Sequence, residues 1–292
     1  MDNFLLQLII AGLAMGSIYA LVALGFVLLV NAVNVINFAQ GEFVMLGAFL
    51  AFTFGAVLRL PYWATAVLTV AAGALIGILF ERLAYHPLRG RDPSIILVST
   101  LAASVFLRNL AMNIWGPVPF SFTEPFGPVL WKVRGITLVP QHFLILAATG
   151  VLVAALYWFL FHTRLGKMMR AASQDRLAAQ TIGIRVGSIG VVTFMIAAAF
   201  GAAAGLLVAP VFFVSVDMGF SVGLKAFIAT IIGGWGSVPG AVAGGLILGL
   251  VEVLATAYGS SEYKDVVAFA VLILFLIALP RGVFGEKVAE KA

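Results

Sequence analysis

Apolar residues form long stretches along nearly the whole chain, and short polar segments separate them. An α-helix needs roughly 20 apolar residues to cross a bilayer. One apolar stretch is interrupted by glycines, which divide it into a pair of segments at 221–233 and 239–257. The first segment of this pair is too short to cross a bilayer. The pattern predicts an all-α, polytopic integral membrane protein of about seven to nine transmembrane helices, with Gly-rich helix breaks and a re-entrant helix pair. The candidate spans lie at about 5–30, 42–58, 62–80, 94–115, 141–162, 189–215 and 265–280.

Composition supports this class. The chain is 63% hydrophobic and only 10% charged, with a mean hydropathy of +1.13. A soluble domain is near half apolar and a quarter charged, so this chain cannot cover its apolar surface by folding in water. We expect residues 1–292 to form one transmembrane domain, and the first span, which lacks the basic start of a signal peptide, to stay in the mature protein. The absence of cysteine excludes disulfides and thiolate metal sites.

Basic residues gather at the ends of spans, in the segments 81–92 and 163–185 and in the C-terminal tail. The positive-inside rule assigns these segments to the cytoplasm, and it places the N-terminus and the loop 116–140 outside. The pI of 9.7 therefore reflects membrane orientation and does not indicate a nucleic-acid partner.

Two breaks interrupt the apolar pattern at membrane depth. Non-helical backbone survives there only where protein or an aqueous cavity satisfies its N–H and C=O groups, so both breaks are candidates for a solute path. Two simpler interpretations stay open: a helix turn at the inner membrane surface for the first break, and close helix packing for the second, whose glycines repeat at a spacing of four. The candidate path residues are Asn34, Asn37, Gln40, Gly41, Gly233, Gly234, Gly236 and Ser237.

Charged residues within spans are costly and must pair, reach the interface or serve transport. Lys225 and Glu252 lie on the two arms of the broken pair, and we favour a structural ion pair between them over direct contact with a substrate. Arg108 lies near the outer end of its span, where we expect it to extend toward water. The three histidines are scattered and the carboxylates show no metal-ligand spacing, so we predict neither an enzyme nor a metal site.

The segment of about 164–184 has the pattern of an amphipathic cytoplasmic helix with a glycine C-cap at Gly183. A helix lying on anionic lipid is the simpler interpretation. The alternative is a helix that inserts into a groove on a partner. Its apolar and small residues are Leu165, Met169, Ala172, Ala179 and Ile182.

Ala178, Ala179 and Gly183 have the spacing of the Ala-Ala-xxx-Gly loop by which permeases of ABC importers dock their ATPases, although Leu177 replaces the usual acidic residue. Several further segments along the chain add to this match, and together they resemble the permease subunit of the high-affinity branched-chain amino acid ABC importer family. A second departure is Gln40, where many members carry His. The segments are GSIYAL (16–21), INFAQGE (36–42), ERLAYHPLR (81–89), the helix at 170–183, GGWGSVPGA (233–241) and LPRGVFG (279–285).

The resemblance implies a subunit of the bacterial or archaeal cytoplasmic (inner) membrane that moves branched-chain or similar small amino acids inward. It implies a second permease, identical or homologous, two cytoplasmic ATPases that bind the ATP, and a periplasmic or extracellular substrate-binding protein. The chain itself has no Walker A motif, because Met168 follows the only Gly-Lys pair, so no cofactor is expected on it. An ion-coupled secondary transporter or a channel for small polar solutes is the alternative. The implied coupling residues are Arg170, Asp175, Arg176, Ala178, Ala179 and Gly183.

Overall fold

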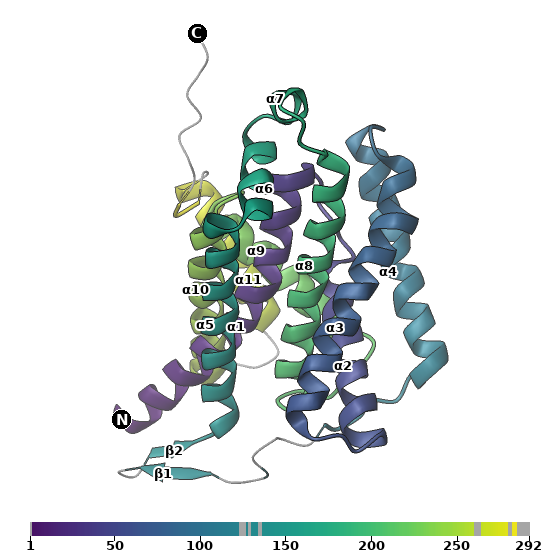
Figure 1. The fold of residues 1–292 in the computed structure, drawn as a ribbon. Coiled ribbons are helices and arrows are strands. Elements are labelled where there is room, and N and C mark those ends of the chain that lie inside the picture. Colours follow the sequence, from purple (N-terminus) through teal and green to yellow (C-terminus); the bar gives the residue numbers. More distant parts are fainter. Residues whose placement is uncertain are drawn as a thin grey trace.

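The computed structural model describes residues 2–122, 127, 130–133, 136–259, 264–279 and 282–284. Figure 1 shows a bundle of helices with one small antiparallel hairpin at one end. Two π-helical turns, η1 (Thr53–Val57) and η2 (Glu81–Tyr85), and the short 3₁₀ turn η3 (His86–Leu88) extend α2 and α3. The elements are α1 (Asp2–Val33), α2 (Gln40–Phe52), α3 (Tyr62–Phe80), α4 (Pro93–Trp115), β1 (Trp131–Val133), β2 (Ile136–Leu138), α5 (Pro140–His162), α6 (Arg164–Gln174), α7 (Arg176–Thr181), α8 (Val186–Val208), α9 (Met218–Gly233), α10 (Val238–Tyr258) and α11 (Lys264–Ala278).

Within the described residues, seven helices are long and apolar enough to cross a membrane. Six of them match the predicted spans, but the seventh is Val238–Tyr258, the second arm of the broken pair. The predicted span at 265–280 is instead a shorter helix of 15 residues. Helix α10 is continuous over Val238–Tyr258 and long enough to cross, so it is not half of a re-entrant pair as predicted; its glycines serve close packing against α1 and α9.

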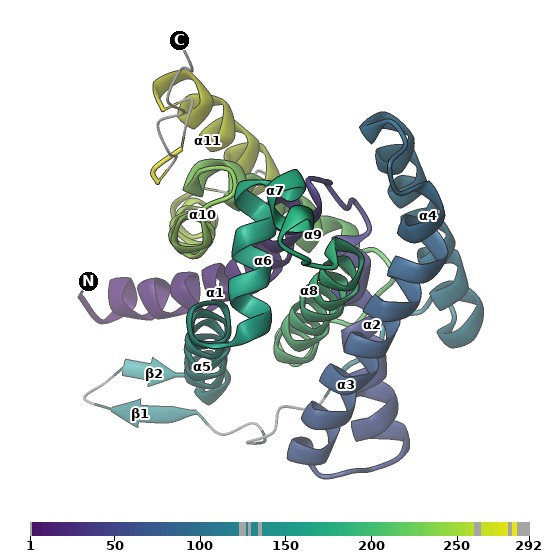
Figure 2. The same cartoon turned by 45° about the horizontal axis from the view of Figure 1, so that its top comes forward.

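Helix α1 lies at the centre of the bundle. Buried residues make up 89% of its most apolar stretch, against 17% for α4, which stands at the edge in Figure 2. Glycines bring α10 against α1 backbone to backbone: a Cβ at Gly249 would lie 2.2 Å from the Gly16 nitrogen, and one at Gly16 would lie 2.7 Å from the Gly245 oxygen. Small residues four apart permit such close approach in lipid. The predicted glycine spacing thus marks the contact between α1 and α10.

The two ends of the bundle differ. Helix α7 and residues 282–284 lie at one end, and the β1–β2 hairpin lies at the other, on the same side as the start of α1 (Figure 1). At the hairpin end, Phe120 pairs with Val214 through backbone hydrogen bonds of 2.9 and 2.8 Å. The segments 81–92 and 163–188, which the sequence assigns to the cytoplasm, meet at the α7 end, where one pocket is lined by both.

Candidate functional site

The second helix break joins α9 to α10 by a tight turn. Gly234 and Gly236 have φ values of 109° and 83°, which L-residues rarely adopt. The Asn31 side chain of α1 donates to the Gly236 carbonyl at 2.7 Å. Behind the turn, the backbone N–H groups of Val283 and Phe284 donate to Ile232 and Gly233, both at 2.9 Å. The freed backbone groups are therefore satisfied by α1 and by the returning chain, as an interruption at membrane depth requires.

Ser237 begins α10. Its hydroxyl accepts a hydrogen bond from the Gly240 N–H at 3.1 Å, and Pro239 lies in the first turn, so α10 carries two ordinary helix-start signals. Gly233, by contrast, packs against Gly240: a Cβ added at Gly233 would lie 1.9 Å from the backbone oxygen of Gly240. Of the predicted path residues at this break, Gly233 is therefore a packing residue.

The first helix break, residues 34–39, is longer than the second and more deeply buried. Asn34 has a positive φ of 53° at the end of α1, and the Asn37 side chain accepts from the Ala39 N–H at 3.0 Å. Gln40 donates from Nε2 to the Ala197 carbonyl of α8 at 2.9 Å. Asn37 and Gln40 are both fully buried. An amide at position 40 thus fastens α2 to α8 in this structure.

Gly41 lies where α2 crosses α9. A Cβ there would lie 2.2 Å from the Gly219 oxygen and 3.0 Å from the Gly223 Cα. The first break therefore brings three helices into contact, and its buried members Asn37, Gln40 and Gly41 do not line the large cavity described next. These residues of the first break and the residues of the second break therefore do not line one common cavity.

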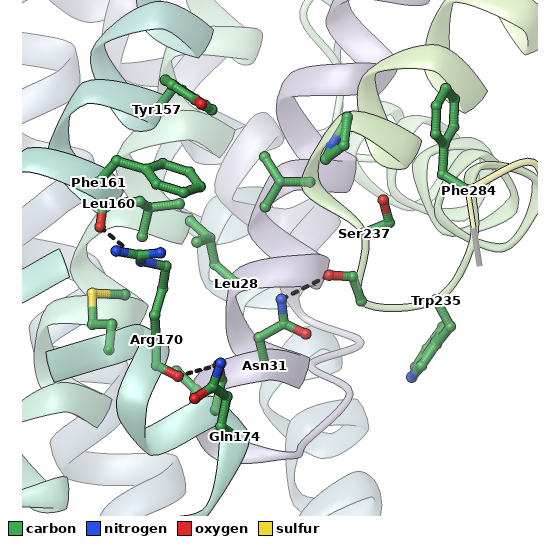
Figure 3. A pocket seen from close by; sticks show the side chains of 16 residues that line it. Leu28, Asn31, Tyr157, Leu160, Phe161, Arg170, Gln174, Trp235, Ser237 and Phe284 are labelled. Carbon is green, nitrogen blue, oxygen red and sulfur yellow. Dashed lines mark hydrogen bonds between the residues drawn. The ribbon is translucent and has the colours of Figure 1, made fainter. Parts of the chain in front are cut away.

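A cavity of about 730 Å³ opens beside the second break, at the α7 end of the bundle (Figure 3). Asn31, Gly236 and Ser237 contribute polar groups to it. Arg170 of α6 reaches across the wall: its Nε donates to the Leu160 carbonyl at 3.1 Å, and its guanidinium lies 4.2 Å from the centre of the Phe161 ring. The remaining wall is mostly apolar or aromatic and includes Leu28, Tyr157, Leu160, Trp235, Val238 and Phe284. A mostly apolar cavity with a few placed polar groups is typical of small-molecule sites.

The charges on the broken pair meet as predicted. Lys225 Nζ lies 2.5 Å from Glu252 Oε1, and the two side chains are only 8% and 11% exposed. The Tyr19 hydroxyl of α1 donates to the other oxygen of Glu252 at 2.6 Å. Asp265 of α11 also pairs with Lys225, at 2.9 Å. The ion pair is confirmed, and it belongs to a cluster that ties α1, α9, α10 and α11 together.

Two further polar contacts escaped the sequence analysis. Arg108 forms an ion pair with Asp217, which precedes α9; the two side chains are 40% and 71% exposed, which agrees with the expectation that Arg108 extends toward water. Glu42 is buried and accepts from the Ser104 hydroxyl at 2.9 Å. Ser104 and Arg108 are four residues apart on α4 and thus on one helix face. The spacing of four could have shown that Ser104 and Arg108 share a helix face, but nothing in the sequence indicated that Glu42 and Asp217 are their partners.

The segment predicted as one helix at 164–184 is two helices. Asp175 interrupts it with an extended backbone (φ −151°), and its side chain accepts from the N–H groups of Leu177 and Ala178. The physical reason is that an aspartate competes as an N-cap for a new helix. Gly183 has a φ of 86°, which confirms the predicted glycine C-cap. Arg176 reaches back to the Ala32 carbonyl at 3.3 Å.

The predicted apolar face of this segment is also divided. Met169 and Ala172 of α6 and Ala179 of α7 are buried in the bundle, with Ala179 only 2% exposed. Leu177 and Ile182 are instead 76% and 73% exposed, and Ala178 is exposed as well. Three residues of the face expected to contact a partner therefore pack internally, whereas its other two, Leu165 and Ile182, are exposed.

Comparisons with known proteins agree with this fold. The family described as branched-chain amino acid transport system / permease component matches residues 8–276. The chain is 36% identical to the high-affinity branched-chain amino acid transport system permease protein LivH of Salmonella typhimurium, over 99% of this chain and 98% of that protein. It is 36% identical to BraD of Pseudomonas aeruginosa (98% and 97% covered) and 30% identical to a probable LivH of Methanocaldococcus jannaschii (92% and 89% covered).

Long apolar helices define a multi-pass helical membrane protein, and a cavity lies beside one of its two helix breaks. The match over residues 8–276 and the identity over nearly the full length are specific. The chain belongs to the family of branched-chain amino acid transport permease components.

Proposed function

We propose that this chain is the membrane-spanning subunit of an ABC importer that carries leucine, isoleucine, valine or a similar small amino acid into the cytoplasm. A second permease of the same family, two cytoplasmic ATPases and an external substrate-binding protein complete the importer in the cytoplasmic membrane. The full-length similarity to permeases named for branched-chain amino acid transport supports this assignment most strongly.

The cavity beside the second break is proposed as the cytoplasmic end of the path. Its volume of about 730 Å³ lies within the range of roughly 300–1,000 Å³ that is common for small-molecule sites. Its apolar wall suits a branched aliphatic side chain, and Asn31 and Ser237 offer hydrogen bonds to the polar end of an amino acid. Gly236 and Ser237 are the members of the predicted path set that support this proposal.

Coupling to the ATPases is proposed to run through the exposed side of α7, which carries Leu177, Ala178 and Ile182. Two large aliphatic side chains, each about three quarters exposed at the outermost tip of the bundle, are suited to a groove on a partner. Ala179, Arg170 and Arg176 hold this helix on the bundle and position it.

The decisive experiment compares a Leu177→Asp/Ile182→Asp variant with Ser94→Asp, which adds a charge at an exposed polar position at the start of α4, away from the proposed path cavity. Copurification from native membranes and ATP-driven leucine uptake in proteoliposomes are measured for both. We expect the double variant to lose the ATPases and at least about tenfold of uptake, equivalent to about 1.4 kcal/mol, while the control keeps both. Uptake that survives the double variant but collapses with an ionophore would establish an ion-driven carrier instead.

A further inference from the structure

A separate pocket of about 410 Å³ lies at the α7 end, between the segment after η3, the start of α4, helix α7 and the start of α8. Three arginines line it, and no acidic residue does. Asn34 and Gln180 add polar groups, and Val33, Val35 and Ile96 give it an apolar side. We refer to it as the arginine pocket; its arginines are Arg89, Arg91 and Arg176.

In the described part of the chain, none of the three guanidinium groups of the arginine pocket forms an ion pair. The nearest carboxylates along the chain are engaged elsewhere. Asp92 accepts from the Ser94 N–H at the start of α4, and Asp175 accepts from two N–H groups of α7. Glu81 lines a neighbouring cavity together with Arg89, without forming an ion pair with it.

One donor of the pocket is also unsatisfied within the described structure. Arg176 uses one terminal nitrogen for the Ala32 carbonyl, and its Nε is buried without a hydrogen-bond partner in the described structure. A buried donor of a charged group without a partner is costly, so its presence indicates a missing acceptor. The Arg89 guanidinium lies against Gly187, where a Cβ would come within 2.7 Å of Nη1.

Helix α8 adds a further positive field. It is 23 residues long, it begins at Val186 on the wall of the pocket, and no side chain caps its first N–H groups. The N-terminus of a helix carries a partial positive charge and favours an anion. Three guanidinium groups, a buried unpaired donor and an uncapped helix start thus converge on one cavity.

We propose that the arginine pocket binds the phosphate headgroup of an anionic phospholipid of the inner leaflet. Arginine forks match phosphate oxygens, and the volume exceeds the roughly 30 Å³ share of one water more than tenfold. The pocket lies where α1 and α3 end and α4 and α8 begin, at headgroup depth on the side that the positive-inside rule assigns to the cytoplasm. Beside it, Ile95 and Val98 of α4 are 48% and 62% exposed, which suits acyl chains.

The test is native mass spectrometry of the full chain in a non-ionic detergent, titrated with phosphatidylglycerol or with phosphatidylcholine. The variant is Arg89→Gln/Arg91→Gln. The matched control is Arg82→Gln/Arg164→Gln, which removes two exposed arginines that do not line the pocket. A basic residue at a membrane surface contributes roughly fivefold in affinity for anionic lipid, so we expect about 25-fold weaker phosphatidylglycerol binding in the variant and less than about threefold in the control.

A second variant, Gln180→Glu, keeps all arginines and adds a carboxylate to the pocket; we expect roughly fivefold weaker binding. Equal binding of phosphatidylglycerol to the arginine variant and the wild type, or equal binding of phosphatidylcholine, overturns the proposal. Displacement of the lipid by millimolar inorganic phosphate would establish a site for free phosphate. Loss of the lipid when the chain is assembled with its ATPases would assign the pocket to a protein interface.

Discussion

Removing both members of the buried ion pair should destabilise the bundle by less than the two single removals added together. Lys225→Met leaves Glu252 in a site where its side chain is 11% exposed and where the Tyr19 hydroxyl is its remaining side-chain partner in the described structure. Breaking a buried pair in this way costs about 3–5 kcal/mol. Glu252→Gln leaves Lys225 paired with Asp265 and keeps an acceptor for Tyr19, so its cost should be smaller, about 1–3 kcal/mol.

The double variant Lys225→Met/Glu252→Gln removes both charges, and its cost should lie below the sum of the single costs by at least about 1 kcal/mol. Unfolding in mixed micelles of a mild detergent and sodium dodecyl sulfate, followed by circular dichroism, measures all three. Asp265→Asn is the internal control: its side chain is 56% exposed, and an exposed pair contributes about 1 kcal/mol or less. Additive single costs within about 0.5 kcal/mol would refute the coupling.

The structure also shows why exchanging the two charges is a poorer test. A glutamate at position 225 would face Asp265, which now lies 2.9 Å from the lysine nitrogen. Two like charges at such a distance repel, so the exchanged pair would not restore stability even if the pair is real. Neutral replacements avoid this second contact.

Three further outcomes are expected. In intact cells an impermeant thiol reagent should label Ser121→Cys and not Ser173→Cys, and the reverse pattern would invert the orientation. Gly236→Ala should cost about 1–2 kcal/mol in the same unfolding assay, because φ is 83° there and a Cβ would lie 2.9 Å from Asn31 Oδ1; Gly150→Ala, at a helical position with open space, should be neutral or slightly stabilising. Gly249→Ala should cost about 1–3 kcal/mol by forcing α10 away from α1, and an unchanged unfolding midpoint would contradict that contact.

Most of the fold could be predicted from the sequence because lipid makes the physical rule simple. Every apolar stretch near the length of the bilayer must be helical, and six of the seven long apolar helices were found this way. The Lys225–Glu252 pair could be predicted for the same reason, since a charge at membrane depth needs a partner. Its extension to Tyr19 and Asp265 could not, because both are ordinary residues in their own helices and only the packing brings them together.

The path residues were predicted less well, because a helix break has one sequence signature and two uses. Glycine at a break can give a turn its positive φ, as Gly236 does, or let two backbones meet, as Gly41 does against Gly219. Polar residues carry the same ambiguity. Asn31, which fastens the second break, looks like any helix residue, whereas the more conspicuous Gln40 is fully buried and donates to the Ala197 carbonyl of α8.

The division of the 164–184 segment shows where amphipathic patterning stops being informative. Periodicity identifies which residues share a helix face, but not whether that face meets the same chain or a partner. Here Ala179 is small and buried, so α7 can lie close to the bundle, and its larger neighbours Leu177 and Ile182 then point outward. Large aliphatic groups on the exposed side carry an unfavourable hydration cost that only a partner surface or lipid can relieve. Ala179→Asp would therefore damage the permease itself, whereas a substitution at Ile182, which lines neither the path cavity nor the arginine pocket, tests the contact with the ATPase alone.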